Sequence, residues 1–260
     1  AVIVDNDSKQ TALSIVESFK KQSFYKIEYY VEPEQNIALA RNKAVENAKG
    51  NYIAFIDDDE FPTNTWLLNL YKAYNNYNAD GILGPVKPHF DEEPPSWLIK
   101  GKFCERPSYN TGTVLHWDDT RTGNVLFNRD IFMDENNRFG PEFGKTGGED
   151  VQFFEKMIKE GRVFVWCADA PVYETVLPAR LKKTFYLKKD LRIGGLTGEQ
   201  ARGWPNRYKY LTKITLALAF YSVCLPFSFF FGAHAYMKYL TKFLYYAGCI
   251  LGFCGWVIIR

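Results

Sequence analysis

The chain has 260 residues, of which 47 % are hydrophobic, and carries a formal net charge of +2 at pH 7. This length suits one large α/β domain with a small appendage, and so much apolar sequence excludes a disordered chain. The small net charge identifies no partner. The five cysteines lack CxxC or zinc-type spacing, which excludes a zinc module, and we interpret them as reduced thiols of a cytoplasmic protein.

Strands and helices alternate along the first part of the sequence. Apolar, β-branched runs predict strands at residues 2–4, 27–31, 52–56, 81–85 and 163–166. Helical spacing of apolar residues predicts helices at residues 11–21, 36–49, 65–77 and 149–160. The run at 52–56 is apolar throughout, as expected of a strand covered on both faces. The alternation predicts an α/β fold with a doubly wound, mostly parallel sheet.

The segment between residues 85 and 122 breaks this rhythm. It contains five prolines, and proline removes a backbone donor, so we expect no regular structure there. A loop of this length is usually functional or mobile. Its tryptophans, Trp97 and Trp117, are expected either to stack on a sugar or to anchor the loop to the domain.

The C-terminal part consists of a basic segment and an apolar tail. Residues 179–213 contain ten Lys and Arg against two acidic residues, whereas residues 214–237 and 243–259 contain no charged residue. The two apolar runs bracket the roughly 20 residues that cross a bilayer, and residues 238–242 would form a tight connection. We predict a helical hairpin that spans or associates with the membrane, with the basic segment on the cytoplasmic side. Helices lying in the interface and a buried helical pair are the alternatives.

Three consecutive carboxylates, Asp57, Asp58 and Asp59, follow the apolar run at residues 52–56. Ligands of open α/β sheets bind at the carboxyl ends of strands, and adjacent carboxylates repel one another unless a cation is present. Hard oxygen ligands suit Mg²⁺ or Mn²⁺, which commonly share substrate phosphates. The alternative is a solvated acidic turn that caps the helix expected near Thr65.

A second acidic pair, Glu149 and Asp150, follows Gly147 and Gly148 at the start of a predicted helix. Acidic residues in a first helical turn are favoured by the helix dipole alone, which is the simplest interpretation. The two glycines favour a functional one, because they allow a substrate to approach the backbone closely.

Together these motifs resemble the family 2 glycosyltransferases of GT-A fold, and among them the succinoglycan-type polysaccharide transferases with a hydrophobic C-terminus. The matching segments are IVDNDS at residues 3–8, NIALARNKAVENAKGNYIAFIDDDEFP at 36–62, TGN at 122–124, FGKTGGED at 143–150 and VYETVLPARL at 172–181. The resemblance covers residues 1–202.

The resemblance implies roles in metal binding and catalysis. Asp59 would bind a Mg²⁺ or Mn²⁺ ion directly, and Asp57 would help to hold the ribose or the metal. Asp150 corresponds to the catalytic base, with Glu149 supporting it. Glu174 lies where some relatives carry a metal-binding histidine.

Further residues are implied to bind the nucleotide sugar or to lie on the acceptor side. Asp5 stands where the family contacts the nucleotide base. Asn36 and Arg41 fall in the segment that lines the nucleotide-diphosphate pocket, and Asp58 belongs to the same donor site. The acceptor side comprises Gly147, Gly148 and Asn124, which follows a short strand of the family.

The domain plan that follows has three parts: a GT-A catalytic domain at residues 1–178, a basic juxtamembrane segment at 179–213 and a hydrophobic helical hairpin at 214–260. The family begins with a further strand and helix that carry a PTYNR-like segment. This unit is absent here, so we expect that about 30 residues are missing and that the chain is a fragment.

The implied activity is the inverting transfer of a sugar from a nucleotide-diphospho-sugar to a hydroxyl of a membrane-associated glycan or lipid-linked acceptor. It would take place at the lipids of the inner membrane, on the cytoplasmic side, in polysaccharide or lipopolysaccharide synthesis and without nucleic acid. The alternatives are a nucleotidyltransferase and a membrane-attached scaffold with a degenerate transferase fold. The leading prediction requires the aspartate triplet and the Glu-Asp pair to face each other across one cleft.

Overall fold

A computed structural model describes residues 1–144 and 147–256, so Lys145 and Thr146 of the FGKTGGED motif and the end of the predicted apolar tail lie outside the described residues. The chain forms two units. The first, called the sheet unit, contains residues 1–87 and 106–174, and the second, called the helical unit, contains residues 88–105 and 175–260. The predicted catalytic domain at residues 1–178 is therefore not contiguous, because residues 88–105 belong to the helical unit.

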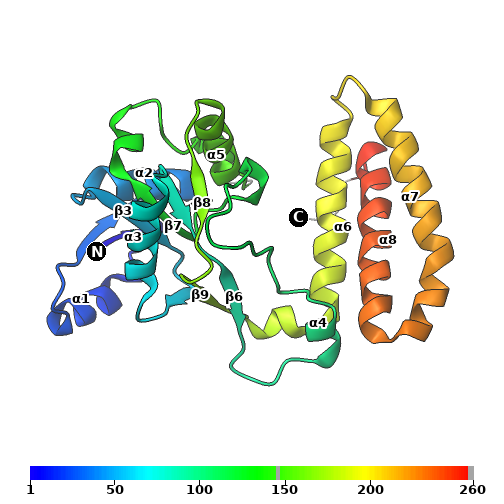
Figure 1. The fold of residues 1–260 in the computed structure, drawn as a ribbon. Helices are drawn as coiled ribbons and strands as arrows, with labels where there is room; N and C mark the ends of the chain where they lie inside the picture. Colours follow the sequence, from blue (N-terminus) through cyan, green and yellow to red (C-terminus); the bar gives the residue numbers. More distant parts are fainter. Residues whose placement is uncertain (145–146, 257–260) are drawn as a thin grey trace. The chain divides into compact units, whose positions relative to one another are not determined.

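A four-stranded sheet forms the centre of the sheet unit, with strand order β3-β7-β5-β8 (Figure 1). Its strands are β3 (Tyr52–Ile56), β7 (Asn124–Asn128), β5 (Gly81–Leu83) and β8 (Phe164–Trp166). β7 runs antiparallel to both β3 and β5, and only β5 and β8 pair in parallel. The prediction of a mostly parallel sheet is wrong for this sheet, because β7 lies between β3 and β5 and runs antiparallel to both.

A separate parallel pair, β1 (Val2–Asp5) with β2 (Glu28–Val31), is connected through α1 (Leu13–Gln22) and leads into α2 (Ile37–Asn47). β3 is an edge strand of its described sheet, and its residues Ala54 and Ile56 are exposed. The prediction that β3 is covered on both faces is therefore wrong for the described residues. The preceding strand–helix unit stays a prediction.

A third sheet has the order β4-β9-β6 and is made of β4 (Glu60–Pro62), β9 (Val172–Thr175) and β6 (Val86–His89). β6 and the helix α4 (Ser96–Lys100) lie in the proline-rich segment where we expected no regular structure. Pro88 is compatible with β6 because β6 is an edge strand, where a missing backbone donor leaves no ladder bond unmade.

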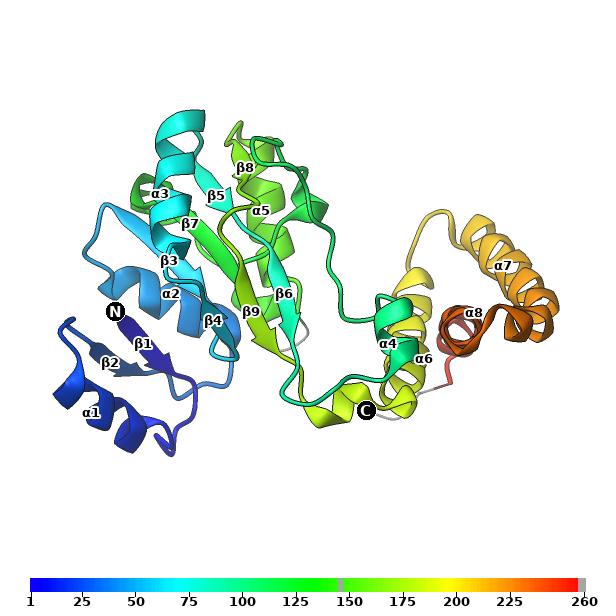
Figure 2. The same ribbon diagram turned by 60° about the horizontal axis from the view of Figure 1, so that its bottom comes forward.

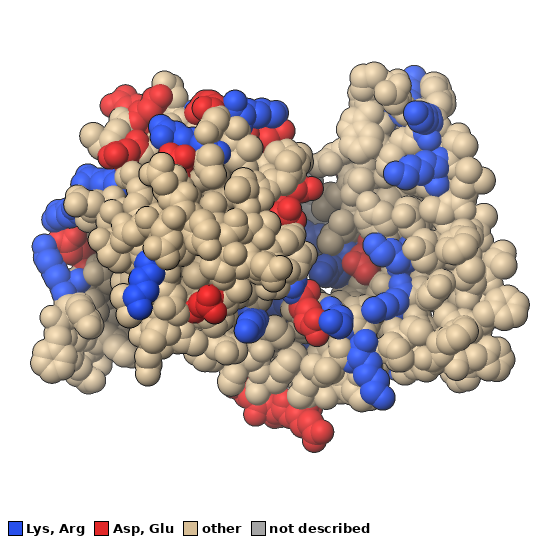
Figure 3. All heavy atoms as spheres, in the orientation of Figure 1, with Lys and Arg blue, Asp and Glu red and all other residues tan. Residues whose placement is uncertain are grey.

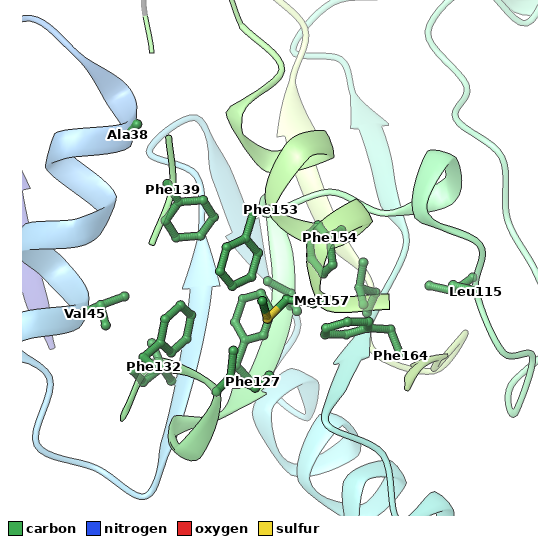
Figure 4. Packing of buried hydrophobic residues seen from close by; sticks show 14 of the residues in the cluster. Ala38, Val45, Leu115, Phe127, Phe132, Phe139, Phe153, Phe154, Met157 and Phe164 are labelled. Atoms are coloured by element: carbon green, nitrogen blue, oxygen red, sulfur yellow. The ribbon is translucent and has the colours of Figure 1, made fainter. Parts of the chain in front are cut away.

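Phenylalanines dominate the core of the sheet unit. Phe127 of β7 packs edge-on against Phe153 of α5 (Glu149–Lys159) and stacks on Phe154 of the same helix. Figure 4 shows these rings with their neighbours pointing toward one another between α2, β7 and α5. The fully buried phenylalanines are Phe127, Phe139, Phe153, Phe154 and Phe164. This packing fixes the first turn of α5, and with it Glu149 and Asp150, against the sheet.

The helical unit consists mainly of α6 (Lys183–Ala201), α7 (Arg207–Ser228) and α8 (Ala233–Phe253), which lie side by side in both ribbon views (Figures 1 and 2). Trp97 of α4 packs against Phe103 and Tyr186 in its core, so this tryptophan is an anchor, as one of the two interpretations had it, but it anchors residues 88–105 to the helical unit and not to the predicted catalytic domain. Most of the basic segment forms α6, and its last residues begin α7.

Glycines allow α6 and α8 to touch through their backbones. A Cβ placed on Gly198 would lie 2.0 Å from the carbonyl oxygen of Cys249, and one on Gly252 would lie 1.9 Å from that of Gly195. Such distances exclude any side chain, so the two helices approach more closely than larger residues permit.

The apolar tail turns earlier than we predicted. The chain reverses at Gly232, which has a φ of +95°, and Lys238 and Lys242 lie inside α8 rather than in a connection. The prediction placed the turn at residues 238–242 because they interrupt the apolar sequence with charges. The chain turns instead at a glycine, which adopts a left-handed conformation without steric cost. Among the described residues one helical stretch, Arg207–Phe231, is long and apolar enough to cross a membrane, and 11 % of its most apolar window is buried.

Candidate functional site

The acidic triplet directly follows β3, as predicted. Asp58 and Asp59 are exposed in the turn between β3 and β4, and Asp57 is partly buried at its start. β4 separates this turn from α3 (Trp66–Tyr77), whose N-cap is Thr65. The triplet therefore does not cap that helix, and the alternative of a structural capping turn is wrong.

Arg41 of α2 connects the two acidic motifs. Its Nη1 donates a short hydrogen bond to Oε1 of Glu149, and its Nη2 lies 3.6 Å from Oδ1 of Asp57. The side chains of Arg41 and Glu149 are only 12 % and 6 % exposed, so little water screens their pair. The ring of Phe139 supports the guanidinium at 5.8 Å. The aspartate triplet and the Glu-Asp pair are thus brought to the two sides of one arginine.

Gly147 and Gly148 precede α5 with φ values of +83° and +102°, which favour glycine over other residues. Gly148 is the N-cap, and the first turn contains Glu149 and Asp150. Oδ1 of Asp150 accepts a hydrogen bond from the backbone N–H of Val151 at 2.8 Å, and the residue is only partly buried. A carboxylate in this position is able to accept a proton from a neighbouring hydroxyl.

Glu60, which the sequence analysis did not single out, lies beside Asp57. Its Oε2 accepts a hydrogen bond from the Asp57 backbone N–H at 3.3 Å, and its Oε1 is buried without a hydrogen-bond partner. Burial, followed by the charge of Asp57, raises the pKa of Glu60 from 4.5 to about 8. Burial also raises the pKa of Asp57, against the opposing effect of Arg41. No sequence motif indicates this role of Glu60, because the side chain comes close to Asp57 only through the turn that leads into β4.

Glu174 lies directly across from Glu60 in the β4–β9 ladder. Two carboxylates in this position repel each other. Arg106 compensates, since its Nη2 donates to Oε2 of Glu174 at 2.6 Å. The site residue Arg106 was missed in the sequence because it comes from the proline-rich segment, far along the chain from both acids.

The carboxylates around Gly123 suit a divalent cation. A Cβ on Gly123 would lie 2.9 Å from both Oδ2 of Asp57 and Oε1 of Glu60, so only glycine leaves the space between these oxygens free. Hard oxygens, one of them buried without a partner, are the donors that Mg²⁺ and Mn²⁺ prefer. Within residues 1–144 and 147–256 no three His, Cys, Asp or Glu side chains converge as a complete metal cage. A cation here would take the rest of its coordination from water and substrate phosphates.

Two predicted binding residues, Asn36 and Asp5, use their side chains inside the protein. Asn36 is the N-cap of α2: its Oδ1 accepts from Ala38 and Leu39, and its Nδ2 donates to the Pro141 carbonyl. Oδ2 of Asp5 accepts from the Tyr29 hydroxyl at 2.6 Å. Direct nucleotide contact by these side chains stays a prediction, and this geometry shows that both first of all shape the loops beside the site.

Asn124 is the first residue of β7, so it lies within a strand. It is buried, its Oδ1 accepts from Trp66, and its Nδ2 donates to the Pro85 and Ala170 carbonyls. That this amide binds the acceptor substrate stays a prediction. The geometry does not favour it, because the amide already makes hydrogen bonds inside the protein.

The sequence profile described as Glycosyl transferase family 2 matches residues 1–135, slightly more than half of the chain. The chain belongs to this family. The succinoglycan biosynthesis protein ExoM of Rhizobium meliloti is 30 % identical over 259 residues, which cover 98 % of this chain and 82 % of ExoM. The predicted resemblance to family 2 and to its succinoglycan-type members is confirmed.

Solved structures confirm the GT-A-like fold. Staphylococcus aureus TarS 1–349 in complex with UDP-GlcNAc superposes with a TM-score of 0.52 at 16 % identity, covering 98 % of this chain and 82 % of that one. GalNAc-T7 with UDP, GalNAc and Mn²⁺ superposes with a TM-score of 0.51 at 13 % identity, covering 76 % and 44 %. At these identities the likeness concerns the fold alone.

Proposed function

We propose that this chain is an inverting, metal-dependent glycosyltransferase that moves a sugar from a nucleotide-diphospho-sugar to a hydroxyl of a membrane-associated glycan or lipid-linked acceptor. The reaction would serve polysaccharide or lipopolysaccharide synthesis at the cytoplasmic face of the inner membrane. The observation that carries the proposal is the contact of Arg41 with Asp57 on one side and Glu149 on the other. This arginine lies between carboxylates suited to a cation and a helix whose first turn contains Asp150.

The donor is assigned to the carboxylate side of the site. Asp57 and Asp59 would hold the donor's diphosphate through Mg²⁺ or Mn²⁺, and Asp58, Asp5 and Asn36 would line the nucleotide. The cation would neutralise the charge that develops on the leaving diphosphate. A pocket in the sheet unit, lined by Arg106, Asp119, Arg121, Asn124 and Trp166 among others, combines polar groups and an aromatic ring, which suits a sugar.

Asp150 is assigned as the base. Its carboxylate would take the proton of the acceptor hydroxyl while the acceptor oxygen forms a bond to the anomeric carbon and the bond to the diphosphate breaks. A single displacement of this kind inverts the anomeric configuration. Gly147 and Gly148 would leave room for the acceptor in front of the helix, and Glu149, held by Arg41, would fix the position of the first turn.

The test is a transfer assay on the protein with a panel of nucleotide sugars, in which the released nucleotide is identified. We expect nucleoside diphosphate to appear only with Mg²⁺ or Mn²⁺. Release of pyrophosphate would instead identify a nucleotidyltransferase, and no metal-dependent release with any donor would favour the scaffold alternative.

Two variants separate the roles of the carboxylates. Asp150→Asn should lower transfer by about 10²–10⁴-fold and leave donor binding intact, because only the proton acceptor is lost. Asp59→Ala should lose metal-dependent donor binding. Glu155→Gln, on the exposed part of the same helix, is the control and should transfer normally. Near-normal turnover in Asp150→Asn would contradict the assignment of the base.

A further inference from the structure

An apolar surface of the helical unit is left uncovered, and it ends in a cluster of phenylalanines. Leu216, Phe220, Val223 and Phe227 are 57–66 % exposed and recur every three or four residues, so they form one stripe along α7. The stripe continues into Phe229, Phe230 and Phe231, which are 70–84 % exposed in the turn before α8. We call residues 229–231 the phenylalanine tip. Figure 3 shows no Lys, Arg, Asp or Glu on the visible surface over the lower part of α7.

α8 is held away from the bilayer core by its contact with α6. The backbones meet where Gly194 and Gly198 face Tyr245 and Cys249, and where Gly248 faces Leu191. α6 carries Lys188, Lys189, Asp190 and Arg192 around this contact, and charged side chains are costly in hydrocarbon. Because the two helices touch through their backbones, α8 does not enter the hydrocarbon along its length without α6.

Lys238 limits how deeply the phenylalanine tip inserts. It is exposed on α8, seven residues after Phe231, which corresponds to about 10 Å at the helical rise. Lys242 follows one turn later and is also exposed. An ammonium group is stable at the headgroups and attracts anionic lipids there. A depth of about 10 Å is that of interfacial insertion and a third of the roughly 30 Å hydrocarbon core.

We propose that the phenylalanine tip and the adjoining end of the α7 stripe, Val223 and Phe227, insert into one leaflet of an anionic lipid bilayer, with Lys238 and Lys242 at the headgroups, and that the helical unit does not span the membrane. This inference rests on the membrane site of the proposed function and specifies how the chain reaches it. The occupant of the apolar surface is lipid, since apolar side chains bordered by ammonium groups match the acyl chains and anionic headgroups of a leaflet.

The first experiment measures co-sedimentation of the protein with vesicles of phosphatidylcholine and phosphatidylglycerol. The triple variant Phe229→Ser, Phe230→Ser, Phe231→Ser should reduce partitioning about 100-fold or more, because each lost phenylalanine removes most of its apolar burial. The matched control replaces three exposed apolar residues of the sheet unit, Ile15, Phe19 and Phe24, by serine and should bind like the wild type. Equal binding of the tip variant and the wild type would overturn the inference.

The second experiment determines the depth of the tip. In a variant with Cys224 and Cys254 replaced by serine, Phe230→Cys is exposed to a membrane-impermeant maleimide added outside or enclosed in the vesicles. We expect protection from both sides. Labelling from outside places the tip in water, and labelling from the lumen shows a span; either result overturns the inference. If the wild type does not bind vesicles at all, the membrane part of the proposed function fails as well, whereas loss of transfer activity leaves this experiment unaffected.

Discussion

The two units place the same amino acids in opposite environments. The core of the sheet unit encloses Phe127, Phe153 and Phe164 fully, whereas the helical unit exposes Phe229, Phe230 and Phe231. Buried charges follow the same pattern. The two charged side chains that are buried among the described residues, Glu149 and Glu174, both belong to the sheet unit.

The difference teaches how each unit is held together. Bulky aromatic side chains fill the space between sheet and helices, and this dry interior strengthens the pairing of the few charges it contains. In the helical unit, glycines bring α6 and α8 into backbone contact, so large apolar side chains are left for the outside. The sheet unit therefore has charged groups in its interior, and the helical unit has large apolar side chains on its surface.

The sharpest test of this contrast removes one phenylalanine from each unit. Phe127→Ala should destabilise the sheet unit by about 4 kcal/mol, because it leaves a cavity among packed rings. Phe230→Ala should change stability in detergent-free solution by less than about 0.5 kcal/mol, because its side chain is 84 % exposed. Thermal unfolding of both variants checks this, and equal losses would break the comparison.

Replacing the buried arginine tests whether the charges of the sheet unit depend on each other. Arg41→Met should destabilise the protein by about 3 kcal/mol, since Glu149 would be left buried without a cation. The double variant with Glu149→Gln should lose less than the sum of the two single changes. Arg41→Lys should recover part of the stability, and the exposed Lys238→Met should have no measurable effect. Additive losses would show that Arg41 and Glu149 do not act as a pair.

The glycine contact of the helical unit predicts a smaller effect. Gly198→Ala places a methyl group 2.0 Å from a backbone oxygen and should cost about 2 kcal/mol as α6 and α8 move apart. Gly203→Ala, where the nearest atom is 3.6 Å away, is the control and should be tolerated. Differential scanning calorimetry distinguishes them, and identical behaviour would show that the backbone contact contributes nothing.

A separate effect concerns pH. The folded-state pKa of Glu60 is about 8, above its usual 4.5, so the folded protein binds this proton more tightly than the unfolded chain does. Stability without metal should therefore fall as pH rises from about 4.5 to about 8. In Glu60→Gln this component should be absent. Thermal unfolding between these pH values with a chelator checks the slope, and parallel curves for the two proteins would contradict the shift.

Much of the sheet unit follows from local sequence patterns. The end of β3 before the aspartate triplet, the start of α5 at Glu149 and the helix α3 were placed by apolar spacing and glycines. β7, by contrast, is antiparallel to its neighbours, and nothing in its own residues specifies direction. β6 was missed because Pro88 argues against a strand unless the strand lies at an edge, and the position of an edge depends on the rest of the sheet.

The sequence by itself determined the family, the acidic motifs, their place after a strand and before a helix, and the apolar character of the tail. These are local features, set by side-chain chemistry and spacing along the chain. Only the tertiary structure decided that Arg41 lies between Asp57 and Glu149, that Glu60 faces Glu174, and that the tail turns at Gly232 with its phenylalanines outside. Each of these depends on which distant segments pack together, and packing is a property of the whole folded chain.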